Sequence, residues 1–335
     1  MMEWIKKWKA AYPRLTDIHL TEGEAVAVRE NGNLIKTEET AGKDLFEAFF
    51  RDLPDTKKEE YGKSGACDIA FGGADGRFRL HLYRCGNKDC AALRLLPPLS
   101  GMKADPDEAW LEEVAGLTRG LVIISGPSGS GKSTTLARLL QKIGGKRSCH
   151  IVTLEDPVEY ILSSKRSLIH QREIGADAAD FAQGVRDSLR EDPDVIAVGE
   201  MRDGETMAAA LTAAETGHLV LGTLHNGRAT EAISRMIHGF PADRQSEVRS
   251  VLASVLRCVS TQRLWRRGTK TILLREILTN SPAISRLIRD GKEEQVVSYM
   301  ETGAKHMRTL KQAAYHVKGV AAEERKELLK LVEEM

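Results

Sequence analysis

The chain has 335 residues, a formal net charge of +1 and 41% hydrophobic residues, which suits about two globular domains with apolar cores. The near-neutral charge argues against a nucleic-acid partner, and no apolar run approaches the roughly 18–20 residues that span a bilayer. The five cysteines are scattered and suit neither a disulfide framework nor a zinc site of CxxC pairs. These features favour a reduced, cytoplasmic protein.

The first 97 residues predict a mixed α+β domain. Residues 1–9 place Trp4 and Trp8 among lysines, which indicates a short amphipathic helix rather than a signal peptide. The sequence Glu30-Asn31-Gly32-Asn33 between two apolar runs is typical of a hairpin turn. Strands are expected at 17–20, 25–29, 67–71, 77–84 and 91–96, and a helix at 45–53.

Residues 98–109 are rich in residues that break helices and strands, so they predict a linker to a second domain, residues 110–335. In that domain, short strands that are apolar on both faces alternate with helical stretches, which is typical of an α/β domain with a parallel sheet covered by helices. Strands are expected at 121–125, 150–154, 195–198, 219–223 and 271–278, and helices at 243–258, 281–290, 307–317 and 321–333.

The strongest functional signal is an apolar strand that runs into a glycine-rich loop and then a helix. The loop reads Gly126-Pro127-Ser128-Gly129-Ser130-Gly131-Lys132-Ser133-Thr134, which matches the P-loop pattern GxxxxGK[ST]. Its glycines let successive N–H groups wrap around phosphate oxygens, and the helix N-terminus favours anions. We expect a nucleoside triphosphate site with Lys132 on the β- and γ-phosphates and Ser133 on Mg²⁺. The alternative is a glycine-rich turn with a chance lysine.

Acidic residues follow two of the expected strands. Glu200 ends the apolar run 195–199, where P-loop enzymes keep an acid beside Mg²⁺. Glu155, Asp156 and Glu159 follow the strand at 150–154 and suit Mg²⁺ coordination or the orientation of an attacking water. A solvated acidic turn has the same spacing, so the second cluster is the weaker signal.

Two histidines, His218 and His225, bracket the expected strand at 219–223. A neutral imidazole can hydrogen-bond a γ-phosphate or the attacking water, although histidines are also often ordinary core or surface groups. The first domain places four arginines on its expected strands: Arg77, Arg79, Arg84 and Arg94. They are either ordinary exposed residues or the source of an arginine that stabilises transition-state charge, as P-loop ATPases often require.

Together these motifs resemble the secretion ATPase superfamily of type II secretion and type IV pilus motors, over about residues 16–310. The four boxes of that superfamily occur in order. They are a Walker A box at 126–134, an Asp box at 151–160, a Walker B box at 192–203 and a His box at 211–225. Within the superfamily, the chain is similar to the PilT-like pilus retraction ATPases.

Two stretches outside the boxes point to the retraction branch. The segment His170-Gln-Arg-Glu-Ile174 is similar to that branch's Asn-Gln-Arg-Glu segment. Residues 283–290 match its AIRNLIRE helix except at Ser285, Arg286 and Asp290. The sequence also has no four-cysteine zinc module, which assembly and secretion relatives usually carry. These features favour retraction over assembly.

The resemblance implies a fold, an activity and partners. Residues 1–97 correspond to the family's PAS-like α+β domain, and residues 110–335 to its RecA-like P-loop ATPase domain. The family works as hexameric rings, which implies a homo-hexamer that hydrolyses ATP with Mg²⁺ to power pilus retraction and twitching motility. We expect it in the cytoplasm, at the cytoplasmic face of the inner membrane. There it would associate peripherally through the pilus platform protein.

The resemblance also implies roles for single residues. Lys132 holds the phosphates, and Glu159 is the general base or water-orienting residue. Glu200 supports Mg²⁺ together with Ser133. The histidines His218 and His225 couple the nucleotide state to conformation. Two arginines of the first domain match family arginines that close over the γ-phosphate: Arg79 and Arg94.

Other functions stay open on the sequence. One is an ATPase for pilus or pseudopilus assembly or for type II secretion. Another is a nucleotide-binding regulatory subunit of such a motor, with little turnover of its own. A nucleic-acid motor fits poorly, because residues 263–267 form the one basic run and a solvated turn is its simpler interpretation.

Overall fold

The computed structural model describes residues 2–73, 76–96, 98–267 and 270–333. The chain divides into two compact units, Met1–Lys103 with Pro157–Ile161, and Ala104–Asp156 with Leu162–Met335. The division after Lys103 falls inside the expected linker, residues 98–109. The grouping of Pro157–Ile161, most of which belongs to the Asp box, with the first unit was not predicted.

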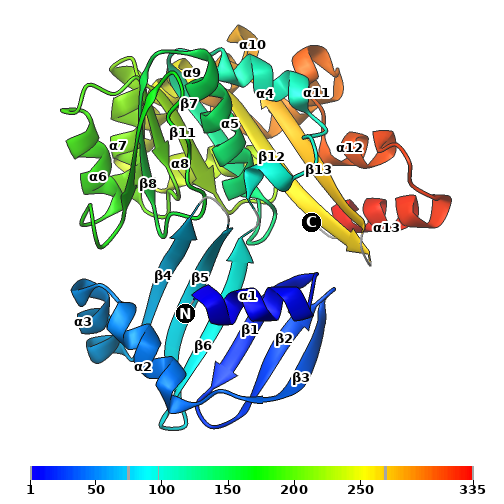
Figure 1. Ribbon diagram of the computed structural model, residues 1–335. Coiled ribbons are helices and arrows are strands. Elements are labelled where there is room, and N and C mark those ends of the chain that lie inside the picture. Colours follow the sequence, from blue (N-terminus) through cyan, green and yellow to red (C-terminus); the bar gives the residue numbers. More distant parts are fainter. Residues whose placement is uncertain (1, 74–75, 97, 268–269, 334–335) are drawn as a thin grey trace. The chain divides into compact units, whose positions relative to one another are not determined.

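Over its described residues, the first unit is an antiparallel sheet with the helices α1, α2 and α3 and the short 3-10 helix η1 (Figure 1). In its described part, the strand order is β3-β2-β1-β6-β5-β4. Asn31 and Gly32 have positive φ values of 51° and 83°, which confirms the predicted hairpin turn. The elements are α1 (Met2–Ala11), β1 (Leu15–Thr21), β2 (Ala25–Glu30), β3 (Asn33–Thr40), α2 (Lys43–Asp52), α3 (Asp55–Ser64), β4 (Ala66–Gly73), β5 (Gly76–Cys85), β6 (Lys88–Leu96) and η1 (Leu99–Gly101).

The two faces of this sheet differ in what they carry. On β5, every second residue from Phe78 to Leu82 is buried in one cluster with Trp8 of α1 and Phe46 of α2. Because side chains alternate along a strand, the intervening residues, including Arg79, face the other side. The register pairs Arg79 with Arg94 of β6. The face away from the helices therefore holds the arginine pair that the sequence singled out.

The second unit is an α/β domain whose sheet has the order β13-β12-β7-β11-β10-β8-β9 in its described part. All neighbouring strands in it are parallel except β12 and β13, which form an antiparallel hairpin. The elements from the start of the unit to β11 are α4 (Glu108–Ala115), β7 (Gly120–Ser125), α5 (Lys132–Lys146), β8 (His150–Glu155), β9 (Leu168–Glu173), α6 (Phe181–Ser188), β10 (Val195–Val198), α7 (Gly204–Glu215) and β11 (Leu219–Leu224).

The remaining elements cover one side of the sheet and extend its edge. They are α8 (Ala229–His238), η2 (Ala242–Arg244), α9 (Gln245–Val255), β12 (Leu256–Arg267), β13 (Lys270–Thr279), α10 (Pro282–Arg289), η3 (Glu293–Gln295), α11 (Val296–Glu301), η4 (Ala304–His306), α12 (Leu310–His316) and α13 (Ala322–Glu333). In the described ranges, no helix is both long and apolar enough to cross a bilayer.

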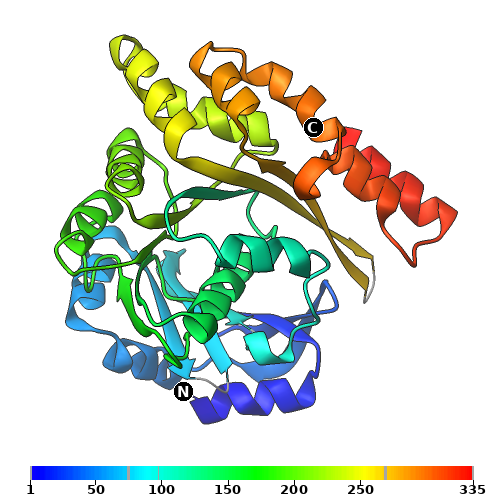
Figure 2. The same ribbon diagram turned by 90° about the horizontal axis from the view of Figure 1, so that it is seen from above.

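Helices cover both faces of this sheet, which explains why its central strands are apolar throughout. Every residue of β7, β10 and β11 is buried. Figure 2 shows the teal α4 and α5 on one side of the sheet and the yellow-green α8 and α9 on the other. The carboxyl ends of parallel strands meet at one edge, so the loops after β7, β8, β10 and β11 are neighbours.

The predicted central strands and the helices α10, α12 and α13 are confirmed, but two predictions are wrong. The basic run 263–267, interpreted as a solvated turn, is the end of strand β12 and buries Trp265. A helix was expected over 243–258, yet α9 ends at Val255 and the chain continues directly as β12. The strand expected at 271–278 is thus half of a long hairpin with β12. Helix α3 and the edge strand β9 were not predicted.

A buried ionic cluster fastens the start of the second unit to β13. The side chain of Arg275 is fully buried and donates from Nη1 to Asp105 Oδ1 at 2.6 Å and from Nη2 to Asp105 Oδ2 at 3.0 Å. Nη1 also donates to Asp107 Oδ2 at 2.9 Å, and the guanidinium lies 4.9 Å from the Trp110 ring centroid. Burial alone would raise the pKa of Asp105, but the bonds to Arg275 lower it overall.

Asp105→Asn is expected to destabilise the protein by about 3–5 kcal/mol at pH 7, because Arg275 would keep a buried charge with a weakened partner. The pKa of Asp105 is lowered in the folded state, so its stabilisation is present above the unfolded-state pKa of about 4 and is lost as the pH falls through the folded value. The gap between variant and wild type should therefore shrink below about pH 4.

Urea unfolding as a function of pH measures this effect. Asp290→Asn is the control, because Asp290 lies 3.8 Å from Arg286 in an exposed pair that contributes little. An Asp105→Asn protein with the same unfolding midpoint as the wild type at pH 7 would contradict the role of the cluster.

Candidate functional site

The P-loop connects β7 to α5, with the strand, loop and helix that the motif requires. Gly126 has a φ of 142°, and a Cβ added there would lie 2.4 Å from the carbonyl oxygen of Gln262. Gly131 precedes α5 with a φ of 91°. Both positions therefore demand glycine, which places the loop backbone around the N-terminus of α5.

Lys132 lies over the loop that it follows. Its Nζ donates to the carbonyl oxygens of Gly126 at 2.8 Å and of Pro127 at 3.1 Å. The next residue, Ser133, is exposed in the first turn of the helix. The ammonium group and the hydroxyl that the sequence assigned to the phosphates and Mg²⁺ therefore both lie at the start of α5, beside the loop.

Glu200 and His225 meet at the same edge of the sheet. Glu200 follows β10, and its Oε1 lies 2.9 Å from His225 Nε2 and 2.6 Å from Arg202 Nε. The last residue of β11, Leu224, pairs with Ser125 of β7, so His225 follows beside the start of the P-loop. The structure therefore brings the Walker B glutamate and the second histidine of the His box together.

The electrostatic surroundings keep His225 neutral at pH 7. Burial and the positive charge of Lys132 lower the pKa of His225, while Glu200 opposes them only in part. A neutral imidazole bonded to Glu200 retains the ability to donate or accept a hydrogen bond.

Mg²⁺ fits the residues that the sequence assigned to it. The Ser133 hydroxyl and the Glu200 carboxylate are hard oxygen donors, which Mg²⁺ prefers. The ion usually takes only one or two protein ligands and completes its shell with waters and substrate phosphates. A donor set of one hydroxyl and one carboxylate is therefore sufficient when a triphosphate is present.

His218 lies at the other end of β11. Its Nδ1 lies 3.0 Å from the carbonyl oxygen of Ala213 and 3.2 Å from Thr216 Oγ1, and its own carbonyl accepts from the Gly120 N–H at the start of β7. Six residues of strand separate it from His225, a span of about 20 Å. Within this unit, the structure does not bring His218 to the P-loop.

The Asp box is divided between the two units: its first residues lie on β8 of the second unit, and its last residues group with the first unit. Glu155 Oε1 accepts from Thr153 Oγ1 at 2.7 Å and from Gln171 Nε2 at 2.9 Å, which gives the His170–Ile174 segment a local structural role. Glu159 lies in Pro157–Ile161, the segment that groups with the first unit. There the neighbouring Val158 carbonyl accepts from Arg77 Nε at 3.0 Å and Nη2 at 2.7 Å.

Each arginine of the first-unit pair is held by its own carboxylate. Arg79 Nε donates to Asp68 Oδ1 at 3.2 Å, and Arg94 Nε donates to Asp17 Oδ1 at 2.8 Å. Both guanidinium groups are substantially exposed. The two aspartates were not predicted as partners of these arginines, although both lie on expected strands, because the pairing depends on register between distant segments.

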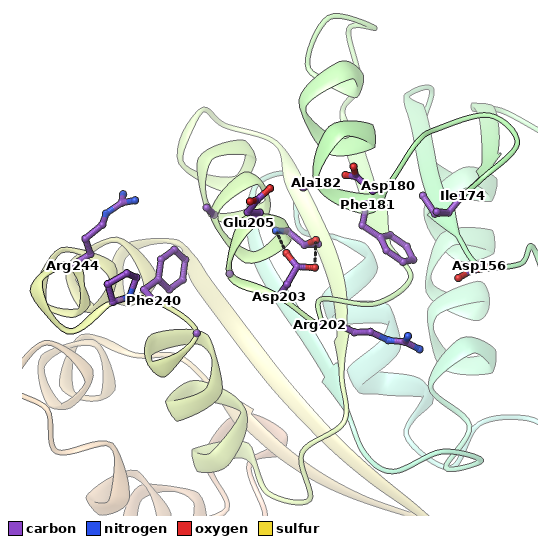
Figure 3. Close-up of a pocket in the computed structure, with 15 residues that line it drawn as sticks. Asp156, Ile174, Asp180, Phe181, Ala182, Arg202, Asp203, Glu205, Phe240 and Arg244 are labelled. Atoms are coloured by element: carbon purple, nitrogen blue, oxygen red, sulfur yellow. Dashed lines mark hydrogen bonds between the residues drawn. The ribbon is translucent and has the colours of Figure 1, made fainter. Parts of the chain in front are cut away.

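A cavity of about 650 Å³ opens beside the same edge of the second unit (Figure 3). Phe181 and Phe240 line it together with the charged residues Asp156 and Arg202. Asp203 caps α7 there and accepts from the Thr206 N–H at 2.8 Å. No P-loop residue is in its described lining, so it is a neighbour of the candidate nucleotide site and not that site.

Comparison with known proteins identifies the family. The family model described as "Type II/IV secretion system protein" matches residues 90–328, well over half of the chain. The chain belongs to this family. The superfamily predicted from the four boxes is thereby confirmed.

Three relatives in this family cover most of the chain. A Pseudomonas aeruginosa protein named "Type IV pilus retractation ATPase PilT" is 37% identical over 86% of this chain and 85% of its own length. A Neisseria gonorrhoeae "Twitching motility protein" is 38% identical over 90% and 84%. The Escherichia coli K12 "Uncharacterized protein YggR" is 43% identical over 79% and 82%.

Solved structures agree with these relatives. The crystal structure of the pilus retraction motor PilT with bound ADP has a TM-score of 0.84 and 37% identity, and covers 99% of this chain and 98% of that chain. The Legionella pneumophila ATPase DotB has a TM-score of 0.78 and 25% identity over 98% and 95%. The predicted α/β fold class is confirmed, and the chain is a PilT-like ATPase of this family.

Proposed function

We propose that this PilT-like ATPase is the motor that couples ATP hydrolysis to type IV pilus retraction. The observation that carries the proposal is the P-loop edge itself, where Lys132 lies over the loop and Glu200 pairs with His225. This edge occurs in a chain that matches a P. aeruginosa pilus retraction ATPase over 86% of its length.

The proposed chemistry begins with the triphosphate on the P-loop. The ammonium of Lys132 exchanges the loop carbonyls for the β- and γ-phosphate oxygens, and the loop N–H groups bind the same oxygens. Mg²⁺, held by Ser133 and Glu200, offsets phosphate charge when it is bound. Glu159 orients a water for in-line attack on the γ-phosphate and accepts its proton.

The arginines of the first unit supply the remaining positive charge. Arg79 and Arg94 each use Nε for an aspartate, which leaves the Nη groups for the oxygens of the transferring phosphoryl group. Their engagement and release with each ATP gives the first unit two states, which a motor requires. His225 reports the nucleotide state through its bond to Glu200, and His218 responds at the far end of β11.

The proposed assembly is a homo-hexamer in the cytoplasm, at the cytoplasmic face of the inner membrane. It associates peripherally with the membrane through the pilus platform protein and has no nucleic-acid partner. Sequential closure around the ring would turn the platform protein and withdraw pilin subunits.

An assembly or secretion ATPase is the second candidate. The Klebsiella pneumoniae "Type II secretion system protein E" is 45% identical, but over 48% of this chain and 31% of that protein. Retraction is favoured because the match to the solved PilT structure covers 99% of this chain, and because α10 keeps Ile284 and Ile288 buried. In α10, Ser285 replaces the arginine of the retraction helix and is buried, where it donates to the Ala253 carbonyl at 2.8 Å.

Counting surface pili in cells that lack this protein separates the two candidates. Loss of a retraction motor is expected to increase the number of pili and to abolish twitching, because assembly continues without removal. Restoration of both properties by the wild-type gene is the control. A strain without any pili would overturn retraction and indicate assembly.

A further inference from the structure

A glutamine on β12 lies directly beside the P-loop. The register pairs Thr261 with Ser125, the last residue of β7, so Gln262 follows next to Gly126. The side chain of Gln262 is fully buried. A buried amide without partners is costly, so its contacts show what the position is for.

Both ends of this amide are bonded to the nucleotide-binding segment. Nε2 donates to the Ser130 carbonyl oxygen at 3.0 Å, inside the P-loop. Oε1 accepts from Thr135 Oγ1 at 3.1 Å, in the first turn of α5. Gln262 therefore joins the loop to the helix that completes the anion site.

The bond to Ser130 fixes the orientation of one peptide plane. A trans peptide is planar, with its C=O and N–H directed to opposite sides. When the Ser130 carbonyl is held toward β12, the N–H of Gly131 must point away from β12. Gly131 has a φ of 91°, a conformation in which a glycine peptide has other orientations available. Gln262 thus selects one of them.

A chain of hydrogen bonds fixes Gln262 in turn. Thr135 Oγ1 accepts from Arg275 Nη2 at 3.0 Å, so its own hydrogen is directed to Gln262 Oε1. Arg275 is anchored by both oxygens of Asp105. The direction of every bond from Asp105 to Ser130 is therefore determined, which excludes the flipped amide.

We propose that Gln262 is a positioning residue for phosphate binding, which acts by holding the Ser130 carbonyl so that the Gly131 N–H faces the bound phosphates. The proposal rests on the nucleotide site described above and adds a residue outside the four boxes to it. Arg275 and Thr135 serve to orient the amide. Gln262 makes its contribution through the loop and needs no contact with the nucleotide.

Gln262→Met tests this role, since methionine retains the length of the side chain and removes both hydrogen-bonding groups. The Kd of the purified full chain for ADP with Mg²⁺ is expected to rise about tenfold, as for the loss of one hydrogen bond. In ATP turnover, KM should rise by a similar factor while kcat changes less than about threefold. Titration calorimetry and phosphate release measure the two effects.

The matched control is Thr261→Val on the same strand. Thr261 is buried, and in the described part of the chain its hydroxyl has no hydrogen-bond partner. This variant should bind ADP within about twofold of the wild type. If Gln262→Met is folded and binds ADP as tightly as the wild type, the positioning role is overturned. A wild-type protein that binds no ADP would instead overturn the nucleotide site itself.

Thr135→Val tests the link to Arg275. Valine keeps the shape of the side chain, but it can neither accept the hydrogen bond from Arg275 nor donate one to Gln262. Its Kd for ADP is expected to lie between those of the wild type and Gln262→Met. A wild-type Kd would show that Gln262 is oriented without Thr135, which would overturn that part of the proposal.

Discussion

Lys132→Ala is expected to lower ATP hydrolysis by the purified protein at least about 100-fold, the scale on which a preorganised electrostatic contact supports a transition state. The ammonium lies over the P-loop, with Nζ 2.8 Å from the Gly126 carbonyl oxygen, and is the cation that we propose binds the phosphate chain. Alanine leaves the loop glycines and the start of α5 in place but removes that charge. Phosphate release at saturating ATP measures the effect.

Lys142→Ala is the matched control on the same helix. Lys142 lies almost three turns further along α5, where its Nζ bonds Glu112 Oε1 at 2.8 Å. The variant loses the same number of atoms and two partly exposed ion pairs, with Glu108 and Glu112, so hydrolysis should stay near the wild-type rate. If both variants hydrolyse ATP equally well, Lys132 has no part in the reaction and the site assignment is wrong.

Glu159→Gln is expected to bind ATP but to hydrolyse it about 100- to 10,000-fold more slowly, the range that general-base catalysis spans. Glutamine keeps the size of the side chain and one acceptor oxygen, but it cannot take the proton of the attacking water. In this variant, nucleotide affinity measured by titration calorimetry should stay near the wild-type value, while turnover measured by phosphate release falls.

Glu205→Gln provides the comparison for this variant. Glu205 is an exposed carboxylate in the first turn of α7 and has no place in the proposed chemistry. It should retain wild-type turnover. A Glu159→Gln protein whose rate stays within a few-fold of the wild type would move the base to another residue of the Asp box.

The parts of the fold that sequence analysis predicted are those with a local physical signature. The apolar runs that became β7, β10 and β11 are buried on both faces, so no alternation was needed to recognise them. The P-loop required glycine at 126 and 131 for backbone reasons that the motif states directly. Asn31-Gly32 has the positive φ values that a tight hairpin needs.

The missed elements lack such a signature. Between α9 and β12, the chain passes from helix to strand at Leu256 without a glycine or proline, so the helical pattern continued past its true end. The edge strand β9 is polar and only partly buried. Helix α3 buries just Lys57 and Tyr61, which leaves almost no hydrophobic period to detect.

In the site too, the residues in local motifs were predicted and their tertiary partners were not. The sequence motifs predicted Lys132, Glu200 and His225 as site residues, and the structure places all three at one edge of the sheet. The groups that hold catalytic candidates in place were not visible, because their contacts depend on tertiary structure. Asp17 meets Arg94 across 77 residues, and Gln262 meets Ser130 across 132.

The central claim is that ATP hydrolysis by this protein shortens type IV pili. Its most direct test is to follow fluorescently labelled pili in living cells that lack the chromosomal gene and carry either the wild-type protein or Lys132→Ala at equal levels. We expect frequent shortening events with the wild type and extension without shortening with Lys132→Ala. Equal shortening in the two strains would contradict this claim.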